Sequence, residues 1–154
     1  MRVVRFFNRQ RALALERKLW RQVARGLLEE WLGRREYELG VHFIGAAEMA
    51  GLNETFLGHE GSTDVITFNH QENGGGHLCG EIFISVDDAL VHARRFGVRW
   101  PREVTRYLVH GVLHLEGFDD TDPASRRVMK RRENKLLKEL CARFDLGKLG
   151  RPCR

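Results

Sequence analysis

Two histidines separated by three residues are the most chemically informative feature of the sequence. His110 and His114 lie in a run whose composition predicts a helix, and residues four apart project from the same helix face. Gly117 then ends the helix and turns the chain back, which brings Asp119 or Asp120 toward the two imidazoles. Two imidazoles and a carboxylate suit Zn²⁺ and leave a fourth position for water. This is the arrangement of a catalytic metal site.

The spacing of these residues resembles the zinc-binding run of metzincin proteases, H-E-x-x-H-x-x-G-x-x-H. Asp120 stands where those proteases carry their third histidine, which favours Asp120 over Asp119 as the third ligand. Gly111 stands at the position of their general-base glutamate, so peptide hydrolysis by their usual route is not expected. The alternative is that both histidines are ordinary helix residues with satisfied hydrogen bonds. We expect one zinc ion per chain, with His110, His114 and Asp120 as both metal ligands and catalytic residues.

Other segments agree in order and spacing with a known family. Thr63–Phe68 reads TDVITF, Gly80–Ser85 reads GEIFIS, and the pair Leu52–Asn53 precedes both. Together with His110–Asp120 they resemble the YbeY family of rRNA-maturation endoribonucleases. The typical segments of that family are T-D-V-L-S-F, G-D-I-x-I-S and H-G-x-L-H-L-x-G-Y-D-H, after a leucine-asparagine pair. The combination is far more specific than any one of these segments.

The resemblance implies a zinc-dependent endoribonuclease that is specific for single strands. Such an enzyme would mature the 3′ end of small-subunit rRNA and act in ribosome quality control. Its partners would be single-stranded RNA, rRNA and the small ribosomal subunit, without a nucleotide cofactor. Two alternatives stay open. One is a non-catalytic ribosome-assembly factor with a structural metal, and the other is a metal-dependent hydrolase of another class, such as a peptidase.

Two positions depart from the family pattern. The third ligand is usually histidine, and here it is Asp120. Aspartate binds zinc through oxygen, so we expect the site to survive, with a less Lewis-acidic metal. The family also usually carries an arginine after an aromatic residue, and this arginine is thought to contact an RNA phosphate. Here Phe56 is followed by Leu57, and the sequence does not decide whether His59 or an arginine elsewhere compensates.

Positive charge is concentrated at the two ends of the chain, whose net charge is +5. Residues 1–35 hold 10 Lys and Arg against 3 acids, and residues 121–154 hold 11 against 4. Residues 36–120 hold 5 against 14. Basic ends around an acidic centre suit a polyanion that one region attracts and another processes. The alternative is that both ends form helices with solvated basic faces.

Cysteine usage and hydropathy favour a cytoplasmic protein. Cys79, Cys141 and Cys153 are too few and too scattered for a disulfide framework, and an odd count fits a reducing compartment. No run approaches the 18 apolar residues of a membrane span, and the N-terminal residues lack the apolar segment of a signal peptide. We therefore expect no membrane partner.

The hydrophobic periodicity predicts an α+β fold in one domain, residues 1–154. We expect a small mixed sheet of about four strands packed with about five helices, and a metal site at the end of a central helix. The predicted strands are Val3–Phe7, Tyr37–Ile44, Asp64–Phe68 and Glu81–Val86. The predicted helices are Arg11–Leu32, Ala46–Gly58, Asp87–Phe96, the histidine helix with Pro101 in its first turn, and a final helix from Asp122-Pro123 to Phe144.

Several other residues have roles that depend on the fold. Thr63 and Asp64 either border the cleft or form a turn. Glu81 is a general base only if its strand faces the metal. His42 and His92 are expected to be structural. Residues 73–76 read Asn-Gly-Gly-Gly and are expected to be a surface connector.

Overall fold

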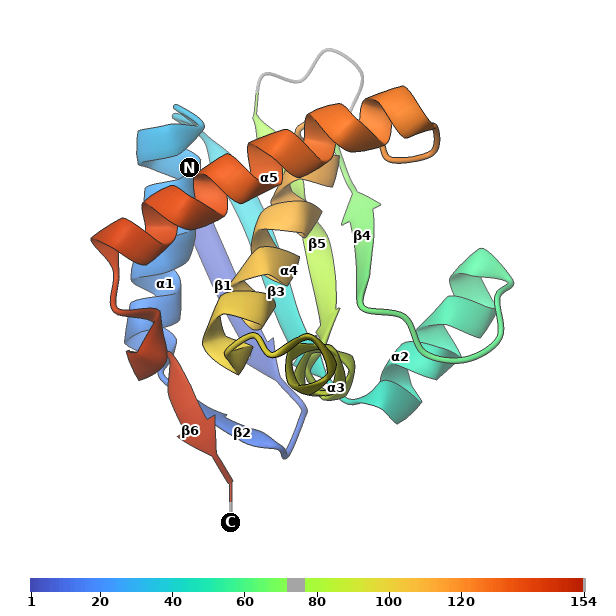
Figure 1. Ribbon diagram of the computed structural model, residues 1–154. Helices are drawn as coiled ribbons and strands as arrows, with labels where there is room; N and C mark the ends of the chain where they lie inside the picture. Colours follow the sequence, from blue (N-terminus) through green and yellow to red (C-terminus); the bar gives the residue numbers. More distant parts are fainter. Residues whose placement is uncertain (72–76, 154) are drawn as a thin grey trace.

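A mixed four-stranded sheet forms the centre of the computed structural model, which describes residues 1–71 and 77–153. The strand order is β1-β3-β5-β4 (Figure 1). β1 (Arg2–Asn8), β3 (Tyr37–Ile44) and β5 (Leu78–Ser85) run parallel, and β4 (Val65–Asn69) lies antiparallel to β5 at one edge. The predicted α+β class with a small mixed sheet is therefore confirmed.

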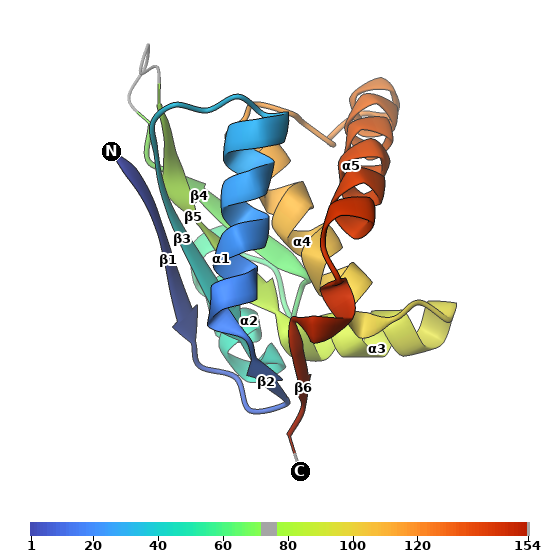
Figure 2. The same cartoon turned by 90° about the vertical axis from the view of Figure 1, so that its left-hand side faces the viewer.

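Three helices cover one face of this sheet (Figure 2). α1 (Arg17–Gly26) continues into a π-helical turn, η1 (Leu27–Trp31). α4 (Trp100–Leu115) packs beside it, and α5 (Pro123–Arg143) crosses the outer side of α4. α4 is central because it is buried against both the sheet and α5, as the sequence predicted for the histidine helix.

α4 approaches β5 closely because glycines stand on both elements. A Cβ atom at Gly111 of α4 would lie 2.7 Å from Cγ2 of Ile82, and one at Gly80 of β5 would lie 2.7 Å from Cδ2 of Leu115. Both distances are shorter than a carbon–carbon contact allows. The two glycines therefore let α4 lie directly on the sheet, and they fix the height of the neighbouring His110 above it.

The opposite face of the sheet is partly covered by α2 (Ala46–Leu52) and its π-helical continuation η2 (Asn53–Leu57). Met49 packs there with side chains of β4 and β5, among them Phe68 and Phe83, in a second small hydrophobic core. The predicted helix 46–58 corresponds to these two elements. α3 (Val86–Phe96) leads from β5 to α4, and its Ser85 N-cap accepts a hydrogen bond from the backbone of Asp88.

A second, two-stranded sheet was not predicted. β2 (Leu13–Leu15) pairs antiparallel with β6 (Gly150–Pro152), which follows a short 3₁₀ turn, η3 (Leu146–Lys148). The predicted helix start at Arg11 was therefore wrong, and α1 begins at Arg17. The reason lies in the tertiary structure. Pairing with β6 satisfies backbone groups of residues 13–15 that a first helical turn would otherwise satisfy.

Two further predictions concern the glycine-rich connector and a membrane span. The predicted connector Asn73–Gly76 lies outside the described residues. Across residues 1–71 and 77–153, no helix combines the length and the apolar character that crossing a membrane requires.

Candidate metal centre

The C-terminal end of α4 presents two imidazoles side by side. His110 and His114 lie one helical turn apart, and their ring centroids are 4.7 Å apart. The helix then stops in a Schellman motif, in which the amide of Gly117 donates to the His114 carbonyl and the amide of Phe118 donates to the Leu113 carbonyl. Gly117 adopts a φ of +103°, a region that favours glycine. The predicted stop thus turns the chain back over the histidines.

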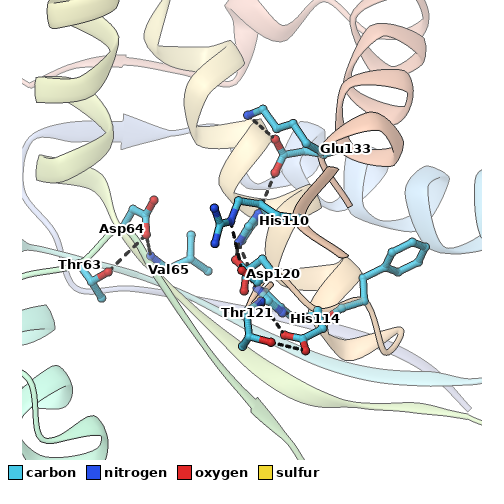
Figure 3. Close-up of polar contacts among 12 residues, drawn as sticks. Thr63, Asp64, Val65, His110, His114, Asp120, Thr121 and Glu133 are labelled. Atoms are coloured by element: carbon cyan, nitrogen blue, oxygen red, sulfur yellow. Dashed lines mark hydrogen bonds and ion pairs between the residues drawn. The ribbon is translucent and has the colours of Figure 1, made fainter. Parts of the chain in front are cut away.

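The turn brings a carboxylate to the two imidazoles (Figure 3). Nε2 of His110 and Nε2 of His114 are 3.1 Å apart, and Oδ2 of Asp120 lies 3.5 Å from each. A tetrahedral zinc ion with bonds of roughly 2.1 Å separates its ligand atoms by about 3.4 Å. The three candidate ligand atoms therefore have the spacing of one face of such a site. The side chains are 25–39% exposed, so the fourth position faces solvent.

Two hydrogen bonds orient the imidazoles. Nδ1 of His110 lies 2.8 Å from Oε1 of Glu133, and Nδ1 of His114 lies 3.1 Å from the Phe118 carbonyl. Both partners are acceptors, which assigns the proton of each ring to Nδ1 and leaves each Nε2 with a free lone pair. Two lone pairs and a carboxylate then converge without a donor among them. This donor set fits a cation, as in carboxylate–histidine–metal sites.

Glu133 is a buried carboxylate of α5 that was not predicted from the sequence. Its side chain is 3% exposed and also accepts hydrogen bonds from Arg106 and Lys130. Burial acts to raise its pKa, but the hydrogen bond with His110 and the charge of Lys130 outweigh burial and lower that pKa to about 2. Glu133 therefore stays ionised beside the candidate centre.

The pKa of His110 responds to the same pair. Burial acts to lower it, but the hydrogen bond and charge of Glu133, together with the charges of Asp64 and Asp120, raise the pKa above its ordinary value. The site is thus negatively charged and attracts positive charge to Nε2 of His110. A divalent cation would meet that requirement without a proton.

Asp119 has a different environment from Asp120. Its carboxylate accepts hydrogen bonds from the backbone amide and the hydroxyl of Thr121, at 3.1 and 2.7 Å, and it lies at the surface. Asp119 therefore stabilises the turn that carries Asp120. Asp64 stands at the start of β4, across from His110 in Figure 3, and its carboxylate accepts from the amide of Val65 at 2.9 Å. It borders the site and also shapes the turn into the strand.

Glu81 does not face the candidate centre. Its neighbours Gly80 and Ile82 lie against α4, and alternate residues of a strand point to opposite faces, so Glu81 lies on the other face. There its two oxygens contact His42 at 2.8 Å and His70 at 2.9 Å. The condition for a role as general base is therefore not met. His42 is 8% exposed and stacks on Phe83, which agrees with a structural role.

A cavity of about 590 Å³ adjoins the centre. Its wall combines candidate ligands with basic residues of α5. We call this cavity the α5 groove, and it is lined by His110, Asp120, Pro123, Arg126, Arg127, Met129, Lys130 and Glu133. Leu57 is not among these residues and is 49% exposed at the end of η2.

A family model described as Endoribonuclease YbeY matches residues 5–141 of this chain. This chain belongs to the YbeY family. The matched range contains all three candidate ligands and Glu133 as well. The family resemblance stated from four short segments is thus confirmed over most of the chain.

Individual YbeY relatives agree with this assignment. Curated proteins named Endoribonuclease YbeY include one from Bacteroides thetaiotaomicron, 36% identical over 105 residues, which cover 68% of this chain and 75% of that protein. One from Chlorobium phaeovibrioides is 34% identical over 139 residues, 90% of this chain and 91% of its own. A solution structure of a Thermotoga maritima protein has the same fold, with a TM-score of 0.66, 23% identity, and coverage of 92% of this chain and 91% of that one.

The signal that could have revealed Glu133 is present in the sequence of this chain. The buried stripe of α5 runs through Met129, Glu133, Leu136 and Leu140, with helical spacing. A glutamate in a core-facing stripe requires a buried partner. Two histidines on the preceding helix are suitable partners, so the position of Glu133 in the stripe predicts its contact.

Proposed function

We propose that this chain is a zinc-dependent endoribonuclease that cleaves single-stranded RNA. We further propose that residues 1–154 act as one catalytic domain in the cytoplasm, in the maturation of the 3′ end of small-subunit rRNA and in ribosome quality control. The observation that carries the proposal is the convergence of His110, His114 and Asp120 beside a groove with a basic wall, in a chain of the YbeY family.

Each residue of the centre has a distinct task in this proposal. His110, His114 and Asp120 would hold the metal through the atoms that converge, and Glu133 keeps the proton of His110 on Nδ1. A bound Zn²⁺ would supply a Lewis acid for the scissile phosphate and lower the pKa of water. Lys130 and Arg127 line the groove and attract the polyanion without reading its sequence.

Position 111 argues against the alternative of a peptidase. Metzincin proteases carry a glutamate there, and Gly111 is pressed against Ile82 of the sheet, with no space for a side chain. In this fold, the general base of a peptidase would therefore have to come from another position. The remaining alternative, an assembly factor with a structural metal, differs from the proposal in activity alone.

The test compares zinc-loaded and chelated protein on labelled single-stranded RNA, the matching duplex and a generic peptide. We expect the zinc-loaded protein to cleave only the single strand, and chelation to abolish cleavage. His114→Ala should lose both zinc and cleavage, whereas His92→Gln, a histidine change on α3 outside the site, should keep both. Zinc-loaded protein that binds RNA but never cleaves it would instead support the assembly factor.

A further inference from the structure

One arginine is hydrogen-bonded to the residue that supplies the candidate carboxylate ligand. Nε of Arg126 donates a hydrogen bond to the backbone carbonyl of Asp120 at 3.3 Å. The carboxylate of Asp120 faces the two histidines, so one residue positions both the candidate ligand oxygen and the guanidinium. Arg126 lies in the first turns of α5 and lines the α5 groove together with His110.

Within residues 1–71 and 77–153 the outer nitrogens of Arg126 form no ion pair, although the charge of Arg126 helps to lower the pKa of the Asp122 carboxylate. Other cations near the centre are already paired, since Arg106 and Lys130 both contact Glu133, and Arg34 contacts Glu116. Arg127 also lines the groove, and among the residues that the structure describes it forms no ion pair and no hydrogen bond with the turn that carries Asp120. Arg126 is thus a cation held at Nε with both Nη groups available to a ligand.

The charge of the candidate ligand set makes such a cation useful. Two neutral imidazoles and one carboxylate leave a bound divalent ion with a net charge of +1. A third histidine would leave +2. A phosphodiester is therefore attracted less strongly by this ligand set. A guanidinium next to Asp120 restores the missing positive charge, and its planar fork matches two phosphate oxygens.

We infer that Arg126 binds the non-bridging oxygens of an RNA phosphodiester in the α5 groove and supplies the guanidinium that Leu57 does not. This inference rests on the proposed function and names the residue that contacts the substrate phosphate. Leu57 lies at the end of η2, outside the groove, whereas Arg126 is fixed to the turn of the candidate centre.

The test compares three variants: Arg126→Ala, Arg126→Lys and Lys135→Ala. Lys135 is exposed on the same helix, nine residues or about two and a half turns from Arg126 and so on the opposite side of α5, and it is the control for a lost charge. Binding of zinc-loaded protein to single-stranded DNA with the sequence of the RNA substrate is measured against salt concentration. Zinc content and cleavage of the RNA are measured in parallel.

Arg126→Ala should keep its zinc and lower kcat on the order of 10²-fold. It should also reduce the salt dependence of binding by the amount expected for the loss of about one phosphate contact. Arg126→Lys should keep the salt dependence but recover little of kcat, because an ammonium does not form the fork. Added guanidinium should partly restore cleavage by Arg126→Ala. Lys135→Ala should behave as the wild type.

The contrary outcomes are distinct. An Arg126→Ala variant that matches the wild type in salt dependence and kcat overturns the inference while leaving the nuclease intact. Loss of zinc in that variant also overturns it, because Arg126 would then only position Asp120. Wild-type protein that cleaves no RNA removes the proposed function, and the salt dependence still decides whether Arg126 contacts phosphate.

Discussion

Oε1 of Glu133 lies 2.8 Å from Nδ1 of His110, so α5 contributes to the candidate metal centre without supplying a ligand. The contact joins two helices that the chain connects through the turn carrying Asp120. It fixes the tautomer of His110 and the orientation of its ring. The position of α5 and the geometry of the centre are therefore coupled.

Glu133→Ala should weaken zinc binding by about 10- to 100-fold, the range typical of partners that orient a ligand. Glu133→Gln should weaken it less, since the amide oxygen still accepts from Nδ1. Affinity is measured by competition with a chelator. Glu139→Ala removes the same charge from the same helix outside the groove and should leave affinity unchanged. Equal affinities for Glu133→Ala and the wild type would contradict the assigned contact.

Asp120→Ala should lose zinc and RNA cleavage together, because it removes the third candidate ligand atom. Asp120→His should keep the metal, since imidazole is the commoner ligand at this position of the family. Asp119→Ala should cost less, because Asp119 contacts Thr121 and only shapes the turn. Elemental analysis of the purified variants decides the assignment, and zinc lost only in Asp119→Ala would reverse it.

Reversing the charge of three basic residues of α5 should weaken RNA binding and flatten its salt dependence, because phosphate contacts release counterions. The variant changes Arg127 and Lys130, which line the α5 groove, and Arg131 to glutamate. A control reverses three charges of α1, at Arg17, Lys18 and Arg21. Titrations at several salt concentrations should show a larger loss for the α5 variant. Equal losses would mean that overall net charge, and not the groove, sets the affinity.

Gly111→Ala should destabilise the protein by about 1–3 kcal/mol, the usual cost of overpacking, because its Cβ would meet Ile82 at 2.7 Å. Gly51→Ala is the matched control, since Gly51 lies in α2 with open space around it, and there alanine should stabilise the helix by about 0.5–1 kcal/mol. Urea unfolding measures both. A neutral Gly111→Ala would show that α4 does not rest on the sheet as described.

The three candidate ligands were predictable because their contacts are local. His110 and His114 are brought together by one helix and Asp120 by one tight turn, so spacing alone decides their meeting. Glu133 was missed because its contact joins two helices and depends on how they cross. Its place in the buried stripe of α5 indicates that Glu133 needs a buried partner, but the stripe alone does not identify that partner.

The fold shows the same division between local and distant information. The strands of the main sheet were predicted because their apolar residues are dense and their lengths are typical. β2 and β6 have three residues each, too few for a periodic signal, and each exists only because the other is present. The apolar pattern of α1 therefore extended the predicted helix backwards over Leu13–Leu15.

The contact between the two ends of the chain sets an order of events during synthesis. Nε1 of Trp20 donates to the carbonyl of Leu149, 129 residues away, and β6 covers β2 beside it. The strands of the main sheet and the residues of the candidate metal centre all precede β6, so they can assemble before β6 has emerged from a ribosome. The contacts of α1 with this segment are completed only after β6 has emerged. We therefore expect the contacts of β6 with β2 and of Leu149 with Trp20 to form last. The nascent chain would hold a structured centre before these contacts form.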